Sequence, residues 1–346
     1  MTGGLFTSRV SRLTTELKPV VVIAGPTAVG KSRIGVLLAQ ALGTEVLTAD
    51  SRQVYRGMDI GMDKPSLDER RGIPHRLIDL VEPDEPFNAG LFRRRALAEI
   101  ERLYEEGRVP LVVGGTGLYI RTLLRGLWDG PVADWSLRAR LMETARAEGP
   151  ESLHRELARV DPESAGRLHP RDQVKIIRAL EVHHLSGRPL SEAHRAHSFG
   201  ERPFSPLLLG LTRERASLYR RIEARVEEQL AKGLVEETGR LLDRGYGRHL
   251  GSMKGLGYRQ IAGYLAGEYS YEEAVRRLKR DTRHFAKRQL TWFRKEPGLV
   301  WVRIEERESP EQVAARLLEL VERFLSELAA SVRSGAGPAA TGTDGR

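Results

Sequence analysis

The residues with the clearest chemical purpose lie between Gly25 and Ser32, where the chain reads GPTAVGKS and matches the pattern G-x-x-x-x-G-K-[ST]. In such a loop the backbone N–H groups converge on one anion, and the helix that follows adds the positive end of its dipole. Lys31 supplies a mobile cation, and the hydroxyl of Ser32 is a ligand for Mg²⁺ that bridges phosphate oxygens. We therefore predict a diphosphate or triphosphate site contacted by Gly25, Pro26, Thr27, Ala28, Val29, Gly30, Lys31 and Ser32. The pattern alone leaves kinases, nucleotide hydrolases and transferases open.

Two further segments carry polar side chains directly after expected strands. Asp50–Gln53 reads DSRQ, and Gly114–Tyr119 reads GGTGLY. Because ligands of parallel sheets lie at the carboxyl ends of the strands, we expect both segments near the phosphate loop. Asp50 could hold Mg²⁺ through water or act as a general base, and Thr116 could donate a hydrogen bond to phosphate or to the attacking group. A capping aspartate and a tight glycine turn are the plainer alternatives.

Short apolar runs alternating with amphipathic stretches must position these residues. Such alternation predicts a parallel sheet flanked by helices, an α/β class resembling the core of P-loop nucleotide hydrolases. The expected strands are Val20–Ala24, Glu45–Thr48, Arg76–Leu80, Pro110–Val113, Leu207–Leu211 and Leu299–Ile304. The expected helices are Lys31 to about Leu42 and residues 90–106, 214–243, 271–295 and 309–328.

The chain changes character after about Gly130, since residues 134–200 are charged and helical with few strand signals. We therefore expect the α/β core at residues 19–132 and 206–328, interrupted by a mostly helical insertion at 133–205. Residues 1–18 are expected to be a flexible N-terminal extension, and residues 329–346 a disordered tail rich in small residues.

Composition narrows the class of protein. The 346 residues suggest about two domains, and no apolar stretch approaches the ~20 residues of a membrane span. The chain has no cysteine, which excludes disulfides and thiolate metal sites and fits the cytoplasm. The net charge of +9 and the pI of about 9.9 favour a polyanionic partner. A bias of base composition toward arginine would explain the same net charge. Only the location of the basic residues on the protein can therefore distinguish the two explanations.

Six segments together resemble the tRNA dimethylallyltransferases, also called tRNA isopentenyltransferases, in their bacterial form. The matching segments are GPTAVGKS at 25–32, ADSRQVYRGMDIGMDKP at 49–65, GGTGLY at 114–119, HPRDQVKIIRALEVHHLSG at 169–187, KGLGYRQ at 254–260 and FAKRQLTWFR at 285–294. They follow the family's order and span about residues 20 to 300. Val29 and Ser32 depart mildly from the family, which often has Ser or Thr and Thr at these positions.

The resemblance implies a reaction in which dimethylallyl diphosphate donates its alkyl group to N6 of adenine 37 in tRNAs that read codons starting with U. The phosphate loop would then hold the leaving diphosphate with Mg²⁺, Asp50 would remove the N6 proton, and Thr116 would orient the base or a diphosphate oxygen. The family's R-I-x-x-R element matches Arg221 and Arg225, and of these we expect Arg221 to reach the diphosphate. The resemblance also implies that the insertion is a mobile domain gripping the anticodon stem-loop. Adenine 37 would have to leave its stack to reach Asp50.

An RNA surface is expected on residues 276–295, where nine Lys and Arg residues face a single acid, Asp281. Basic, aromatic and amide side chains there and elsewhere could bind backbone phosphates and exposed bases. The residues expected to contact tRNA are Asp50, Ser51, Arg52, Gln53, Gln173, Lys175, Arg178, Lys254, Gly257, Tyr258, Arg259, Gln260, Lys287, Arg288, Gln289 and Trp292. Ordinary solvated surface charge is the alternative for the lysines and arginines.

The residues by themselves are also compatible with three other functions. An enzyme that prenylates free AMP, ADP or ATP would share the phosphate loop and would need neither the insertion nor the basic helix. A small-molecule P-loop kinase or nucleotide hydrolase would transfer a phosphoryl group, but no hydrophobic strand of this chain ends in a paired Asp–Glu. A non-enzymatic RNA-binding protein would leave the phosphate loop and Asp50 unexplained. We expect a cytoplasmic monomer with no membrane contact.

Overall fold

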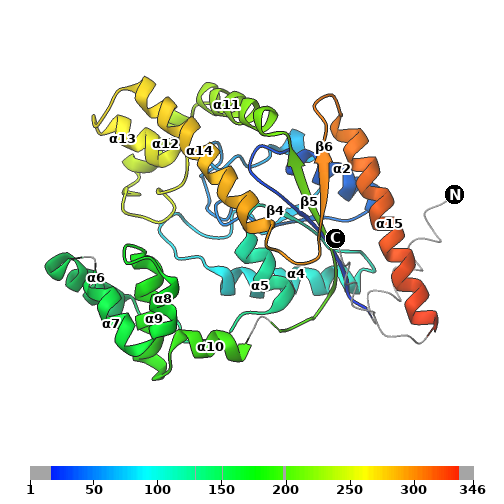
Figure 1. Ribbon diagram of the computed structural model, residues 1–346. Helices are drawn as coiled ribbons and strands as arrows, with labels where there is room; N and C mark the ends of the chain where they lie inside the picture. Colours follow the sequence, from blue (N-terminus) through cyan, green and yellow to red (C-terminus); the bar gives the residue numbers. More distant parts are fainter. Residues whose placement is uncertain (1–16, 129, 150, 198–199, 335–346) are drawn as a thin grey trace. The chain divides into compact units, whose positions relative to one another are not determined.

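The computed structural model describes residues 17–128, 130–149, 151–197 and 200–334 (Figure 1). Nearly all of the expected N-terminal extension and most of the expected tail lie outside these described residues. The chain divides into two compact units, one spanning Arg125–Arg202 and the other formed by the segments on either side. The smaller unit overlaps the insertion expected at residues 133–205, but it both begins and ends a few residues earlier. No helix in the described part of the chain is long and apolar enough to cross a membrane.

A six-stranded parallel sheet forms the centre of the larger unit, with the order β3-β2-β4-β1-β5-β6. This is the parallel α/β fold that the alternating pattern predicts. The strands are β1 Pro19–Ala24, β2 Val46–Thr48, β3 His75–Arg76, β4 Leu111–Gly114, β5 Ser205–Arg213 and β6 Leu299–Ile304. Strands β1 and β4 lie side by side in the middle, so the loops that follow them meet at one edge of the sheet.

Nine helices of the larger unit are described, and two groups of them cover the two faces of the sheet. They are α2 Lys31–Leu42, α3 Leu67–Arg70, α4 Ala89–Glu105, α5 Gly117–Arg125, α11 Arg215–Ala231, α12 Leu234–Asp243, α13 Tyr258–Leu265, α14 Tyr271–Phe293 and α15 Pro310–Ser334.

Strand β1 shows why both faces need cover, because its side chains alternate between two apolar clusters. Val21 and Ile23 pack in the cluster that contains residues of α2 and α15, and Val20 and Val22 pack in the cluster that contains residues of α4 and α5. Figure 1 shows these two pairs of helices around the strands. The central strands are therefore buried on both faces, and we expect the functional residues in the loops at the edge of the sheet.

Most element boundaries shift by one or two residues from the sequence expectation, and three elements differ more. The strand expected at Arg76–Leu80 is only His75–Arg76, because Leu77 and Asp79 have φ angles of 66° and 53°, which end an extended strand. The helix expected at 214–243 is broken at Gly233, whose φ is 96°, into α11 and α12. The last helix continues to Ser334 and so takes in the first residues of the expected tail.

The smaller unit is helical and has its own apolar core, built by residues such as Leu141, Leu157, Ile176 and Leu180. Its helices are α6 Trp135–Glu148, α7 Ser152–Val160, α8 Pro162–Arg167, α9 Gln173–Ser186 and α10 Leu190–His197. The buried carboxylate of Glu181 accepts hydrogen bonds from the guanidinium groups of Arg138 and Arg178. Ionic pairing inside this unit therefore fixes α6 against α9.

Candidate active site

The phosphate loop is built as its sequence predicts, between β1 and the first turn of α2. Gly25 adopts a φ of 149°, and a Cβ atom there would lie 2.7 Å from the carbonyl oxygen of Leu211, so only glycine fits. Gly30 caps α2 with a φ of 111°, and the first turn of that helix carries no acidic residue. The N-terminal end of α2 is therefore left to an anion.

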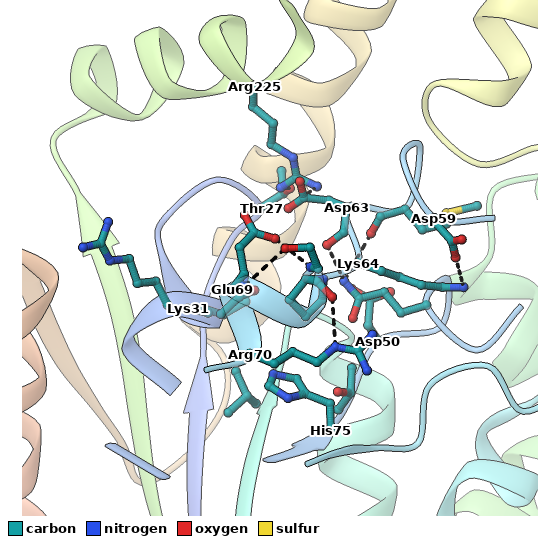
Figure 2. Close-up of a pocket in the computed structure, with 18 of the residues that line it drawn as sticks. Thr27, Lys31, Asp50, Asp59, Asp63, Lys64, Glu69, Arg70, His75 and Arg225 are labelled. Carbon is teal, nitrogen blue, oxygen red and sulfur yellow. Dashed lines mark hydrogen bonds and ion pairs between the residues drawn. The ribbon is translucent and has the colours of Figure 1, made fainter. Parts of the chain in front are cut away.

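A cavity of about 1040 Å³ opens beside this loop (Figure 2). Its walls come from the loop, from the ends of β2 and β4, from the segment 59–71 and from α11. Among its lining residues are Thr27, Ala28, Gly30, Lys31, Ser32, Asp50, Gln53, Asp63, Lys64, Arg221, Arg225 and Gln289. The cavity thus places a phosphate loop, a carboxylate and several cations around one space.

Lys31 is the central cation of the cavity. Its Nζ donates a hydrogen bond to the carbonyl oxygen of Pro26 at 2.7 Å. Burial above all, together with the nearby Arg225, lowers the pKa of Lys31 to about 8, although the carboxylates of Asp50 and Asp63 act in the opposite direction. A diphosphate would stabilise the charged form, because it adds negative charge where the ammonium group is poorly hydrated.

Three arginines converge on the phosphate loop from β5 and α11. Nε of Arg221 donates to the carbonyl of Ala28 at 2.9 Å, and Nε of Arg213 donates to that of Val29 at 3.1 Å. Figure 2 shows Arg225 reaching toward Thr27, whose Oγ1 accepts at 2.8 Å, and toward Asp63, whose carboxylate lies 2.9 Å away. Arg221 and Arg225 both line the cavity, although the sequence led us to favour Arg221 alone.

Asp50 lies at the end of β2 and lines the same cavity. Its Oδ1 accepts a hydrogen bond from the backbone N–H of Arg52 at 2.8 Å, which fixes the carboxylate relative to the segment that follows it. Gln53 is turned inward, since its Nε2 donates to the carbonyl oxygens of Met62 and Asp63. The guanidinium of Arg52 donates to the carbonyl of Gly251 at 2.8 Å. In the described structure, therefore, Gln53 and Arg52 hold protein segments together.

Thr116 stands beside Asp50 without lining the cavity. Its Oγ1 accepts the N–H of Ser51 at 3.0 Å and donates to Oγ of Ser51 at 3.3 Å. The N–H of Thr116 in turn donates to the carbonyl of Ala49 at 3.2 Å. Thr116 thus ties the glycine turn after β4 to the segment that carries Asp50, whereas the sequence predicts a contact with a substrate.

Gln289 of α14 was expected to face RNA, and the structure places it inside the protein. Its Oε1 accepts the N–H of Thr27 at 2.8 Å, and its Nε2 donates to the carbonyl of Gly115 at 2.9 Å. The side chain is buried, so its amide is committed to these two loops. Gln289 therefore joins the phosphate loop to the turn after β4, and because it also lines the cavity, its contact with a base edge stays a prediction.

Replacing Gln289 by Leu is expected to destabilise the fold and to weaken diphosphate binding together. The change leaves the N–H of Thr27 and the carbonyl of Gly115 without their partner, at a cost of about 1–3 kcal/mol for each group. Urea denaturation and calorimetric titration with inorganic diphosphate measure the two effects. His284→Leu, at an exposed position of the same helix, is the matched control, and equal behaviour of the two variants would contradict this role.

Tyr258 was expected to stack on an RNA base, and the structure places its ring in the protein interior. The ring is fully buried at the start of α13, and its hydroxyl donates to the carboxylate of Glu237. Burial and that carboxylate raise the pKa of Tyr258. Gln260 is buried as well, with its amide bonded to the N–H of Gly257 and to Asp281. In the expected RNA-binding motif at 254–260, Lys254 and Arg259 have exposed side chains.

Glu237 is a functional residue that our reading of the sequence missed. Its buried carboxylate accepts the backbone N–H groups of Asp59, Ile60 and Gly61 at 3.0–3.1 Å. Asp59 and Ile60 line the cavity, and the same wall continues through residues 62–71. A signal existed, because Glu237 shares the i, i+3 and i+7 face of α12 with Leu234 and Leu241, and a carboxylate on an apolar face needs a partner.

The basic residues of α14 separate into two groups. Lys279 and Arg283 pair with Glu227 and Glu223 of α11, so part of the expected basic stripe holds two helices together. Lys287 and Arg288 are exposed further along the helix. Trp292 is half-buried, with the guanidinium of Arg121 lying 4.5 Å from the ring centroid. Its ring packs against the apolar cluster around α5, and stacking of its exposed part on a base stays a prediction.

The candidate RNA residues of the smaller unit lie at the start of α9. Lys175 is exposed and pairs with Asp172. Arg178 is half-buried, and it donates to Glu181 at 2.6 Å and to the carbonyl of Pro131 at 3.1 Å. Gln173, the first residue of the helix, is half-buried. Arg178 is thus largely a structural residue of this unit, whereas Lys175 stays accessible to a partner.

The oxygens in the cavity fit Mg²⁺ only as part of a complex with phosphate. Ser32 and Asp50 both line the cavity and offer the hard oxygen ligands that Mg²⁺ prefers. Within the described ranges there is no group of three or more His, Cys, Asp or Glu side chains arranged to hold a metal. Since Mg²⁺ is commonly held by one or two protein oxygens together with phosphates and waters, these residues suffice once a diphosphate is bound.

Fold and site together define a parallel α/β protein of the phosphate-loop class, with a carboxylate and two arginines facing the loop. Residues 53–296 match the model of the family described as IPP transferase. The chain is 49% identical over 89% of its length to a tRNA dimethylallyltransferase of Pelotomaculum thermopropionicum, covering 98% of that protein. It is 52% identical over 83% of its length to a tRNA dimethylallyltransferase of Geobacter metallireducens, covering 93% of it.

Solved structures of similar proteins indicate the same family. A tRNA isopentenylpyrophosphate transferase from Bacillus halodurans superposes with a TM-score of 0.69 at 37% identity, over 91% of this chain and 99% of that one. A eukaryotic dimethylallyltransferase acting on tRNA gives a TM-score of 0.75 at 26% identity, over 93% and 81% of the two chains. The protein belongs to the IPP transferase family.

Proposed function

We propose that the protein transfers the dimethylallyl group of dimethylallyl diphosphate to N6 of adenine 37 in tRNAs that read codons starting with U. The observation that carries this proposal is the presence of Asp50 in the same cavity as the phosphate loop, Lys31 and Arg225. A leaving diphosphate and a proton acceptor then face one reacting carbon. The curated relatives named tRNA dimethylallyltransferases support the choice of donor and acceptor.

The reaction requires stabilisation of the leaving diphosphate and removal of the N6 proton, and different residues of the cavity serve these two tasks. The bond between the allylic carbon and the bridging oxygen breaks, and its electron pair leaves with the diphosphate. The N6 lone pair forms the new C–N bond, and the N6 proton moves to Asp50. Lys31, Arg225 and the end of α2 stabilise the charge that grows on the leaving group. One oxygen of Asp50 is held by the N–H of Arg52, and the other is available for the proton.

Mg²⁺ is proposed as the metal, held by Ser32 and by phosphate oxygens near Asp50. When bound, it would neutralise further charge on the diphosphate. Arg221 is proposed to release the carbonyl of Ala28 and bind a phosphate oxygen, since it lines the cavity and guanidinium groups favour phosphate.

We further propose that the exposed part of α14 binds the tRNA backbone through Lys287 and Arg288. Changing both to Gln is expected to weaken tRNA binding and to lower the slope of log affinity against log salt by roughly 0.9 for each phosphate that the variant no longer neutralises. Filter binding across a salt series measures it, with His284→Gln, an exposed position of the same helix, as control. An unchanged slope in the double variant would remove this surface from the tRNA site.

The transfer itself distinguishes the proposed function from its rivals. Purified protein with Mg²⁺ and labelled dimethylallyl diphosphate is offered unmodified tRNA with adenines at positions 36, 37 and 38, and in parallel free AMP and ATP. Label in tRNA alone is the expected result. Label in the free nucleotides would make the protein an adenylate isopentenyltransferase, and ATP hydrolysis without any alkyl transfer would indicate a kinase-like enzyme. We propose that the enzyme acts as a cytoplasmic monomer.

A further inference from the structure

A second hollow of about 470 Å³ lies away from the cavity with Asp50, in the connection between α12 and α13. Arg248, His249, Met253, Lys254 and Arg259 line it. Met253 is buried, whereas the other four side chains are exposed and carry N–H donors. The lining includes no carboxylate. A hollow with this lining favours an anion.

The positive charge of this hollow is only partly neutralised by the protein. Arg248 pairs with Glu268, and Arg259 pairs with Asp281, each at 2.8 Å. Asp281 is shared, because it also pairs with Arg280 at 2.9 Å. Neither carboxylate lines the hollow, and each guanidinium has five N–H donors, so both arginines can bind an anion while they keep these partners.

The connection that carries the hollow is fastened to the segment that carries Asp50. The carbonyl of Gly251 accepts a hydrogen bond from the guanidinium of Arg52 at 2.8 Å, and the buried hydroxyl of Ser252 donates to the carbonyl of Pro83. The N–H of Lys254 donates to the carbonyl of Leu250, which closes a turn. The hollow is therefore a preformed feature at a fixed place relative to the proposed base.

The imidazole of His249 lies close to Gly247. A Cβ atom on Gly247 would lie 2.6 Å from Nδ1 of His249, so the ring folds back over the Gly247 backbone. His249 and Arg248 are both exposed and line the hollow. Two positions that no sequence motif singled out, Arg248 and His249, thereby join Lys254 and Arg259 of the motif at 254–260.

We propose that this hollow binds a phosphate group of the tRNA backbone, in the strand that leads to the adenine at Asp50. The inference rests on the proposed function and changes how the motif at 254–260 acts. With the ring of Tyr258 buried, the surface of the motif consists of cations, which bind phosphates and do not read bases. Arg248 and His249 are then RNA-binding residues, and the contact contributes affinity and register without sequence preference.

The test compares charge-removing variants with a matched control in the same connection. Arg248→Gln and Lys254→Gln each remove one cation from the hollow. Arg244→Gln removes an exposed arginine that stacks on Tyr246, 5.1 Å from its ring centroid, and does not line the hollow. The affinity of the full-length protein for an anticodon stem-loop RNA is measured by fluorescence anisotropy across a salt series. Each hollow variant is expected to lower the salt slope by roughly 0.7 to 0.9, and the control to leave it unchanged.

Neutral methylphosphonate linkages placed one at a time in the RNA locate the contact. One linkage is expected to weaken binding to the wild-type protein and to have no further effect on the Arg248→Gln variant. The proposal is overturned if no linkage behaves in this way, or if the hollow variants lower the slope no more than Arg244→Gln. Both readouts measure binding, so they remain interpretable if the alkyl transfer proposed above is not observed.

Discussion

Replacing Asp50 by Asn is expected to slow the transfer to tRNA about 10²- to 10⁴-fold, the usual contribution of a general base. Asn keeps the shape of the side chain and an oxygen that can accept the N–H of Arg52, so the local geometry should survive. It cannot take up the N6 proton at neutral pH. Single-turnover rates from rapid quench, with donor and tRNA both saturating, isolate this step from binding.

The control for Asp50 is Asp68→Asn, which removes an exposed carboxylate from another wall of the same cavity. The control should retain the wild-type rate, and both variants should bind tRNA with unchanged affinity. A near-normal single-turnover rate for Asp50→Asn would exclude it as the base and leave proton removal to solvent or to the diphosphate.

Replacing Lys31 by Gln is expected to have the second largest effect, a loss of about 10²- to 10³-fold in rate, as for the removal of one donor to a developing oxyanion. Donor binding to the free protein is also expected to depend on pH. Because burial lowers the pKa of Lys31 to about 8, the ammonium group loses its charge as the pH rises through that value. The diphosphate binds the charged form better, so donor affinity should fall above about pH 8 and binding there should take up protons.

Calorimetric titration with dimethylallyl diphosphate measures both parts of that prediction. Repeating it in buffers of different ionisation enthalpy gives the number of protons taken up. The wild-type protein should show this uptake, and Lys31→Gln should show none. Lys31→Arg is the second comparison, since a guanidinium stays charged at high pH but has a different shape. Equal proton uptake by the wild-type protein and Lys31→Gln would mean that another group titrates on binding.

The phosphate loop and the alternating strands could be predicted because their signals are local. A glycine-rich turn between an apolar run and an amphipathic helix specifies its own geometry, and Gly25 and Lys31 follow from it directly. The predicted length of the third strand was wrong, because the backbone conformation of two residues in it could not be read from the amino-acid composition. Leu77 and Asp79 adopt left-handed backbone conformations, which Asp adopts more readily than most residues but which a leucine does not indicate.

The roles of Gln289, Tyr258 and Trp292 could not be predicted, because a sequence motif identifies a residue but not the direction in which its side chain points. Each has the chemistry to contact RNA, and each is instead turned into the protein by contacts with distant segments. Gln289 joins two loops that are far apart in sequence, at Thr27 and Gly115. Only the packing of α14 and α13 against the rest of the larger unit decides which face of those helices is inside. Glu237 differs from these three, because its place on the apolar face of α12 was a signal in the sequence.

The central claim is that this cavity joins a dimethylallyl group to N6 of adenine 37, and analysis of the nucleosides in the tRNA product tests it most directly. Unmodified tRNA is incubated with the protein, Mg²⁺ and dimethylallyl diphosphate, digested to nucleosides and analysed by mass spectrometry, with an otherwise identical tRNA carrying guanine at position 37 in parallel. We expect N6-dimethylallyladenosine from the first tRNA, diphosphate in equal amount, and no alkylated nucleoside from the second. Alkylation of another position in both tRNAs, or release of diphosphate without alkylated RNA, would contradict the account.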